Sequence, residues 1–202
     1  MEQENDVIQI RPASREQYVE ALWLLNDPLD EPQRKTEVAA IVQGVGAGET
    51  TLEFLFVALR DDSIVGVVYG SPLPGRVAIV KPAQLAAGES NALAIALHDK
   101  LEQSLRAAGI ELMQALVDVR WSGCIKRLSK AGFDKTAYLK YLICEAVEFP
   151  DQAPSLPFAV STYSESRRQE LMGLIDQTYL DTKDFPVLNN CRDLDDVLVG
   201  YQ

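Results

Sequence analysis

The sequence predicts an α/β protein in which helices flank a mixed, mostly antiparallel sheet in three layers. Strand and helix patterns follow one another in the order β-α-α-β-β-β-α-β-α-β over residues 7–148. A strand, a crossover helix and a further strand in that order require one parallel pairing, because strands joined by hairpins are antiparallel. Of the 202 residues, 47% are hydrophobic and 24% charged, so the chain can bury a core without disulfides or metals.

The first elements are one strand and two helices. Residues 7–11 alternate in polarity and are rich in β-branched side chains, which is typical of a strand. Ser14 followed by Gln17 has the spacing of a capping box and predicts a helix start. A second helix is expected over 32–45, where apolar residues recur at helical spacing. The apolar stripe expected on the first helix consists of Val19, Leu22 and Trp23.

The middle of the chain predicts a three-stranded meander and then a long helix. The expected strands cover 51–60, 64–69 and 77–80, with turn residues between them and Pro82 after the last. Leucines recur every four residues in the helix expected over 90–108, which places them on one face. A strand over 112–119, a helix over 121–130 and a strand over 138–147 complete the order.

The element order predicts a domain over 1–148, a proline-containing linker over 149–157 and a partial second unit over 158–202. The last part is expected to hold a strand over 158–163 and helices over 166–179 and 193–201, the order that also opens the first domain. We therefore expect a truncated second copy of the domain; the alternative is a helical extension that packs on the first domain. Its apolar residues either fold back or pair in a homodimer; they are Leu171, Leu174, Ile175, Tyr179 and Phe185.

Composition narrows the functional classes. The formal net charge is −11 and no Lys/Arg-rich run exists, which argues against a nucleic-acid partner. Cys124, Cys144 and Cys191 are widely spaced, so no metal site is expected. His98 is the one histidine, and we expect it to be a partly exposed helix residue. The chain has no run of about 18 apolar residues and no secretory leader pattern, so we expect a cytoplasmic protein without a membrane partner.

The region 77–133 resembles the core of the GNAT N-acetyltransferase superfamily. It contains the strand Val77-Ala78-Ile79-Val80-Lys81-Pro82, a glycine-bearing loop, a long helix, a strand and a short helix that ends in Ala131-Gly132-Phe133. The resemblance in element order covers 7–148, and the two-unit organisation is similar to tandem-domain members such as mycothiol synthase. It implies an acyl-CoA-dependent N-acyltransferase that uses acetyl-CoA and a small-molecule amine and needs no metal.

The resemblance also implies where acyl-CoA binds. In such proteins the fourth and fifth strands diverge, and the cofactor lies between them. Ile79, Val80 and Lys81 would pair with the pantetheine arm through their backbone, and the Lys81 side chain would either meet a phosphate or cap the strand. Backbone N–H groups at the start of the long helix would face the diphosphate. That loop consists of Ala86, Ala87, Gly88, Glu89 and Ser90.

The chain departs from the superfamily pattern in ways that bear on catalysis. The loop has no basic residue, and Glu89 would repel a phosphate unless it points away. The superfamily often has Asn, Ala and Tyr where this chain has Trp121, Cys124 and Leu128. The tyrosine protonates the departing thiolate, and leucine has no proton to give. Two functions therefore stay open: an N-acyltransferase with a degenerate domain, and a non-catalytic module that binds a ligand or pairs with a second domain.

The candidate catalytic residues are Glu53, Asp118 and Tyr69. Glu53 and Asp118 lie on or near strands that face the expected cleft, and either would act as a base if burial raised its pKa. Tyr69 would supply a hydroxyl group. The alternative is a solvated strand-edge carboxylate in the first two cases and simple sheet packing in the third.

Overall fold

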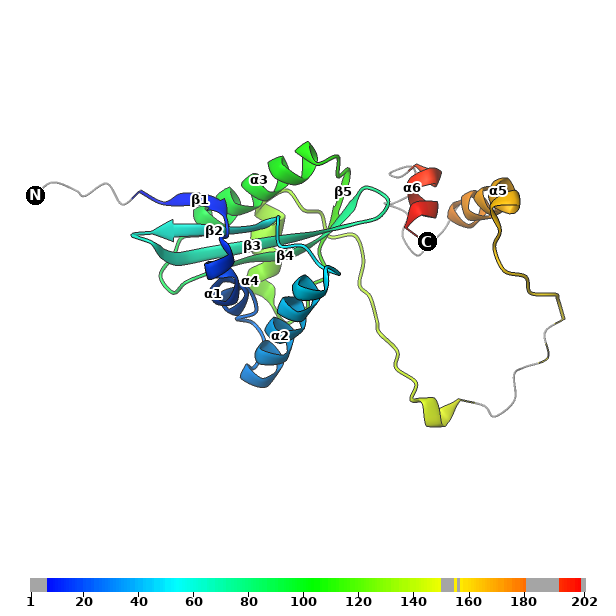
Figure 1. Ribbon diagram of the computed structural model, residues 1–202, viewed down its shortest axis with the longest axis horizontal. Coiled ribbons are helices and arrows are strands. Elements are labelled where there is room, and N and C mark those ends of the chain that lie inside the picture. Colours follow the sequence, from blue (N-terminus) through cyan, green and yellow to red (C-terminus); the bar gives the residue numbers. More distant parts are fainter. Residues whose placement is uncertain (1–6, 150–154, 156, 181–192, 201–202) are drawn as a thin grey trace, which may run out of the picture. The chain divides into compact units, whose positions relative to one another are not determined.

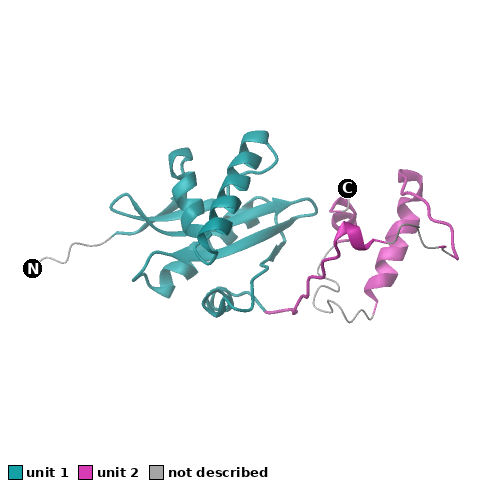
Figure 2. Cartoon of the chain, turned by 90° about the horizontal axis from the view of Figure 1, so that it is seen from below, with its two compact units in different colours: residues 1–134 teal, residues 135–202 magenta. Residues whose placement is uncertain are grey.

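The computed structural model describes residues 7–149, 155, 157–180 and 193–200 (Figure 1). The chain divides into two compact units, residues 1–134 and 135–202 (Figure 2). The sheet belongs to the first unit. Phe185, Cys191 and most of the expected linker lie outside the described residues. Within the described ranges, no helix is long and apolar enough to cross a membrane.

The first unit is built on a five-stranded sheet with the strand order β1-β2-β3-β4-β5. The strands from β1 to β4 pair antiparallel with one another, whereas β4 and β5 pair parallel. The long helix α3 (Asn91–Ala107) makes the crossover, so the predicted single parallel pairing is confirmed. The strands are β1 Gln9–Pro12, β2 Leu55–Arg60, β3 Ser63–Leu73, β4 Val77–Leu85 and β5 Leu112–Gln114.

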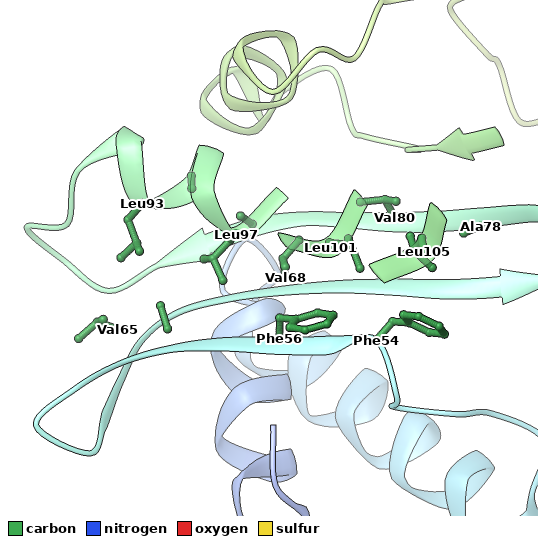
Figure 3. Packing of buried hydrophobic residues seen from close by; sticks show 13 residues of the cluster. Phe54, Phe56, Val65, Val68, Ala78, Val80, Leu93, Leu97, Leu101 and Leu105 are labelled. Carbon is green, nitrogen blue, oxygen red and sulfur yellow. The ribbon is translucent and has the colours of Figure 1, made fainter. Parts of the chain in front are cut away.

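Helices cover both faces of this sheet and give the three expected layers (Figure 1). α1 (Tyr18–Leu25) and α2 (Glu31–Ala47) share one apolar cluster with one face of β2 and β3. α3 packs its leucines on the opposite face, against Phe54, Phe56, Val68 and Val80 (Figure 3). α4 (Ser122–Lys130) contacts both α3 and β4. Alternate β2 side chains enter the two clusters, as the pleat of a strand requires.

The predicted capping box forms, but the residues that α1 buries differ from the predicted apolar stripe. The Ser14 N–H donates to Gln17 Oε1 at 3.0 Å, and a 3₁₀ turn precedes α1. That turn has three residues per turn, which rotates the helix face away from ideal α spacing. Leu22 is buried as predicted, whereas Val19 and Trp23 are exposed. α1 buries Ala21, Leu22 and Leu25.

β4 continues to Leu85, beyond the strand end expected at Pro82. The β3–β4 register shifts between Val67 and Tyr69, so Pro82 and Ala83 lie opposite Val68. Such a β-bulge tolerates a proline because its extra residue leaves the regular hydrogen-bond ladder. β4 therefore continues past Pro82.

The strands expected over 138–147 and 158–163 are wrong, since neither segment is a strand in the described part of the second unit. Leu142 and Ile143 are 94% and 91% exposed. A strand needs a neighbour for its backbone N–H and C=O groups, and these segments pair with none among the described residues. The expected helices do form, and α5 (Arg168–Tyr179) contacts α6 (Leu194–Val199).

α3 lies so close to β3 that two strand positions leave no room for a side chain. A Cβ atom on Gly70 would lie 2.9 Å from Leu105 Cδ1 and 3.0 Å from Leu101 Cδ1. A Cβ atom on Gly66 would lie 2.9 Å from Leu97 Cδ1. These leucines are buried in the cluster of Figure 3. Glycine at these two positions therefore sets the distance between helix and sheet.

Gly70→Val is expected to lower the free energy of unfolding of the first unit by about 1–3 kcal/mol, because the new side chain overpacks the α3 leucines. The measurement is urea unfolding followed by far-UV circular dichroism. Gly46→Ala is the control, since Gly46 lies within α2 and an added Cβ there meets nothing within 4 Å. An unchanged midpoint for Gly70→Val would contradict the close approach of α3.

Candidate functional site

β4 and β5 separate soon after they meet. Their parallel ladder consists of Val77 with Leu112, Ala78 with Met113 and Ile79 with Gln114. β5 ends at Gln114, well before the expected end at Val119, while β4 continues to Leu85. From Val80 onward, β4 is paired with β3 on one edge, and on the other edge no strand of the described structure pairs with it. A wedge therefore opens between the two strands.

The backbone of Val80 faces this wedge. Gly70 is the β3 partner of Val80, and the Gly70 N–H donates to the Phe54 carbonyl at 3.2 Å, on the side away from β4. In an antiparallel ladder, both residues of such a pair turn their N–H and C=O groups away from each other. The polar backbone groups of Val80 accordingly point toward β5, at the position where the β4–β5 ladder ends.

The wedge is followed by a tight turn at the start of α3. The Glu89 N–H donates to the Ala86 carbonyl at 3.2 Å, and Gly88 has a left-handed φ of +89°. Ser90 is the extended N-cap residue, and its side chain makes no capping hydrogen bond. The N–H groups in the first turn of a helix have no partner within the helix, and the helix dipole makes this end positive. The turn can therefore accept an anion.

Glu89 points away from this turn into an ion pair with Arg60 of β2. Arg60 Nη2 lies 3.0 Å from Glu89 Oε2, and Nη1 bonds Oε1, so the pair is bidentate. Only 8% of the Glu89 side chain is exposed. The repulsion expected between Glu89 and a phosphate is thus largely neutralised within the protein.

His98 is buried rather than partly exposed, with a relative exposure of 3%. Its Nδ1–H donates to the Ala94 carbonyl at 2.8 Å, and its Nε2 accepts the Ala83 N–H at 3.3 Å. Ala83 is a residue of the β4 bulge, so a neutral His98 satisfies the N–H group that the bulge removes from the ladder. Burial lowers the pKa of His98, and the hydrogen bond to Ala94 opposes that shift; the charge of Arg127 adds a smaller lowering and that of Asp99 a smaller raising.

Stability is expected to fall as the pH drops below about 6.5, the ordinary histidine pKa. Because the folded pKa of His98 is lowered, the unfolded chain binds the proton first, and the loss extends down to that lowered pKa. His98→Phe removes this dependence and costs about 1–3 kcal/mol at neutral pH by leaving the Ala83 N–H without an acceptor. Urea unfolding between about pH 7.5 and 5.5 measures both effects. The chain has no other histidine, so the same pH slope in His98→Phe would contradict this assignment.

A cleft of about 910 Å³ lies between the α1–α2 connection and the loop from β5 to α4. Glu37 lines it from α2 and also pairs with Lys81 of β4, whose Nζ lies 2.5 Å from Glu37 Oε1 and 3.2 Å from Asn26 Oδ1. The Lys81 side chain is therefore directed at α1 and α2. The residues that line the cleft are Pro28, Leu29, Asp30, Pro32, Gln33, Thr36, Glu37, Asp118, Arg120 and Trp121.

The structure separates the three candidate catalytic residues. Asp118 lines the cleft, where hydrogen bonds from Arg120 hold its pKa at about 2. Glu53 is exposed and does not line the cleft. Tyr69 is buried on the α1–α2 side, and its hydroxyl donates to the Thr51 carbonyl at 2.7 Å, which matches the packing alternative. Burial raises the pKa of Tyr69. Sequence reasoning missed Glu37, because its neighbours in α2 form no motif that distinguishes it from an ordinary charged residue on a helix surface.

α4 closes one side of the wedge with apolar groups. Cys124 and Leu128 are its buried residues, and Trp121 precedes it at the cleft. Leu128, which the sequence resemblance aligns with a tyrosine, is 6% exposed and has no hydroxyl group. This helix therefore supplies no phenolic proton donor at that position.

The fold also occurs in solved acetyltransferases. The aminoglycoside N-acetyltransferase AAC(6′)-Iy in complex with CoA matches with a TM-score of 0.58 and 13% identity, over 72% of this chain and 100% of that chain. A predicted acetyltransferase from Clostridium acetobutylicum with acetyl-CoA has a TM-score of 0.52 and 11% identity, over 71% and 99%. A transcriptional regulator from Bacillus halodurans C-125 has a TM-score of 0.54 and 16% identity, over 68% and 100%.

No protein-family model and no curated protein sequence matches the chain. At 11–16% identity the similar structures establish the fold alone. That fold agrees with the mixed five-stranded sheet, its flanking helices and the parallel β4–β5 junction. The architecture is therefore the α/β fold of the GNAT acetyltransferases, as the sequence resemblance implied.

Proposed function

We propose that the chain is an acyl-CoA-dependent N-acyltransferase that transfers an acetyl group from acetyl-CoA to the amine of a small molecule. The observation that carries the proposal is the wedge between β4 and β5, with the Val80 backbone facing it and the Gly88 turn beyond it. Two of the similar solved structures contain CoA or acetyl-CoA, which supports the same class of cofactor for this wedge.

In this proposal the pantetheine arm lies along the free edge of β4 beside Ile79, Val80 and Lys81 and bonds the backbone of Val80, because the backbone groups of the two flanking residues face β3. An extended ligand that adds to a strand edge gains main-chain hydrogen bonds, and only backbone groups that face outward can make them. Val80 meets that condition. The diphosphate then lies at the turn from Ala86 to Ser90, where the first N–H groups of α3 and the helix dipole favour an anion.

Acetyl-CoA is expected to bind the wild-type chain, and Gly88→Ala is expected to weaken that binding. Both Gly88 and Gly48 have left-handed φ values, +89° and +75°, and an added Cβ meets nothing within 4 Å at either position. The two alanine variants therefore carry the same kind of backbone strain, about 1–3 kcal/mol. Only Gly88 lies in the proposed diphosphate turn, so Gly48→Ala is the matched control. The affinities are measured by isothermal titration. No heat of binding with the wild type at millimolar acetyl-CoA would contradict the proposed function.

The acceptor amine is proposed to bind in the cleft, with Glu37 as proton acceptor. The amine nitrogen attacks the thioester carbon, the carbon–sulfur bond breaks, and the amine proton passes to a carboxylate. Asp118 also lines the cleft, but a carboxyl group with a pKa of about 2 is a poor base. Glu37 lines the cleft and is tied to Lys81, the residue after Val80 on β4.

Glu37→Gln is expected to lower kcat by about 10²–10⁴-fold, because a general base contributes in that range. Asp118→Asn should lower it far less. Lys81→Met distinguishes the role of Glu37 as a base from its role in the ion pair, because this variant loses the ion pair but keeps the Glu37 carboxylate. Release of CoA is followed with a thiol reagent over a panel of small amines, with the acetyl-CoA affinity measured alongside. Equal losses in Glu37→Gln and Lys81→Met would show that only the ion pair matters.

A second candidate is a non-catalytic GNAT-like module that binds a ligand or pairs with another domain. The specific observation in its favour is Leu128, which is buried and apolar at the position of the expected proton donor. CoA release with any amine of the panel would remove this candidate. Binding of acetyl-CoA without release from the whole panel would favour it over the transferase.

We also propose that the second unit is the opening of a second copy of the domain. In the first unit, Ser14 precedes a 3₁₀ turn that leads into α1. In the second unit, Ser164 precedes a 3₁₀ turn that leads into α5. The recurrence of a serine, a 3₁₀ turn and a helix in this order supports the proposal.

A further inference from the structure

Arg127 on α4 is a partly buried cation without a carboxylate partner. Its Nη2 donates to Gln84 Oε1 at 3.2 Å and lies 3.4 Å from Cys124 Sγ. Its Nε is buried and has no hydrogen-bond partner within the described parts of the chain. None of the ion pairs formed within the described residues includes Arg127.

This arrangement is costly unless something else completes it. A guanidinium group has five N–H donors and remains charged at every physiological pH. Arginines removed from water are normally paired with a carboxylate or a phosphate. Here the two acceptors, an amide oxygen and a thiol sulfur, are both neutral. The site thus has a surplus of donors and one uncompensated positive charge, which is the complement of an anion.

The position of Arg127 identifies where that anion would lie. Gln84, its partner, stands near the end of β4, just before the turn that begins at Ala86. The charge of Arg127 also lowers the pKa of His98, so the guanidinium lies near α3 as well. α4 contacts both β4 and α3. The cation therefore stands where β4, α3 and α4 meet, beside the turn with the uncapped N-terminus of α3.

The turn itself provides no positive side chain. Ala86, Ala87, Gly88, Glu89 and Ser90 contain one ionisable group, and that group is the carboxylate held by Arg60. Backbone N–H groups and a helix dipole favour an anion, but they balance only about half an elementary charge. A diphosphate carries more charge than this. A cation from outside the turn is needed, and Arg127 is a partly buried cation that contacts the end of β4 and has no carboxylate partner among the described residues.

We propose that Arg127 binds the diphosphate of acyl-CoA and supplies, from α4, the positive charge that the Ala86–Ser90 turn lacks. The proposal rests on the proposed function in one respect, namely that the ligand is acyl-CoA. On binding, the guanidinium exchanges its neutral contacts with Gln84 and Cys124 for charge-assisted hydrogen bonds to phosphate oxygens, which are shorter and stronger.

The test is isothermal titration of the full chain with CoA, 3′-dephospho-CoA and pantetheine. Arg127→Gln is expected to weaken CoA and 3′-dephospho-CoA about ten- to a hundredfold, the usual effect of losing charge-assisted bonds to a phosphate. Pantetheine, which has no phosphate, should be bound alike by both proteins. Lys126→Gln removes the same charge from the neighbouring exposed position on α4 and is the matched control. Arg127→Lys keeps the charge and should recover part of the affinity.

Each outcome distinguishes the two proposals. A wild-type chain that binds no CoA overturns the proposed function and this inference together. A wild-type chain that binds CoA while Arg127→Gln binds it equally well overturns only this inference. Equal losses for CoA and pantetheine in Arg127→Gln would assign Arg127 the purely structural role of holding α4 on β4. A loss with CoA but not with 3′-dephospho-CoA would place Arg127 at the 3′-phosphate and also contradict the proposal. Thermal unfolding of each variant shows whether it is folded.

Discussion

The unequal pairing of the two edges of β4 is the constraint on which the site depends. One edge is bonded to β3 through most of the strand, whereas the other meets β5 only from Val77 to Ile79. The bulge at Pro82 and Ala83 bends the strand, and a buried neutral His98 takes the Ala83 N–H that the bulge exposes. An unpaired N–H at such a depth costs about 1–3 kcal/mol. A single ring nitrogen thus helps to hold the shape of β4 where the wedge opens.

Charge pairing arranges the surroundings of this wedge. Arg60 of β2 withdraws Glu89 from the turn before α3, and Lys81 of β4 holds Glu37 on α2 beside the cleft. Ion pairs at partly exposed positions contribute little stability, typically below about 1 kcal/mol. Their larger effect here is on position, because each pair fixes where a carboxylate points. Arg127 is the exception among these cations, since the described structure gives it only neutral partners.

Sequence patterns predicted what is decided locally. The leucine period of α3, the capping box at Ser14 and the order of the first five strands are set by neighbouring residues, and all three agree with the structure. The bulge at Pro82 and the burial of His98 depend on β3 and on the bulge itself, which local patterns do not record. Residues 138–147 have the apolar and aromatic composition of a strand, but pairing requires a partner that their own sequence does not contain. Glu37 has its place in the cleft only because Lys81 and the β5–α4 loop come to it in the fold.

Leu128, which the sequence resemblance aligns with a tyrosine, has no proton to give, yet this does not by itself exclude the proposed acyl transfer. General acid catalysis contributes about 10²–10⁴-fold, and a thiol with a pKa near 8.5 leaves as a thiolate without a large penalty at neutral pH. The harder proton transfer is on the other side of the reaction. An alkyl amine with a pKa near 10.4 is almost fully protonated at neutral pH, and only its neutral form is a nucleophile. In the proposed function, the cleft between α2 and the β5–α4 loop, which Glu37 and Asp118 line, therefore bears on catalysis more than the leucine on α4 does.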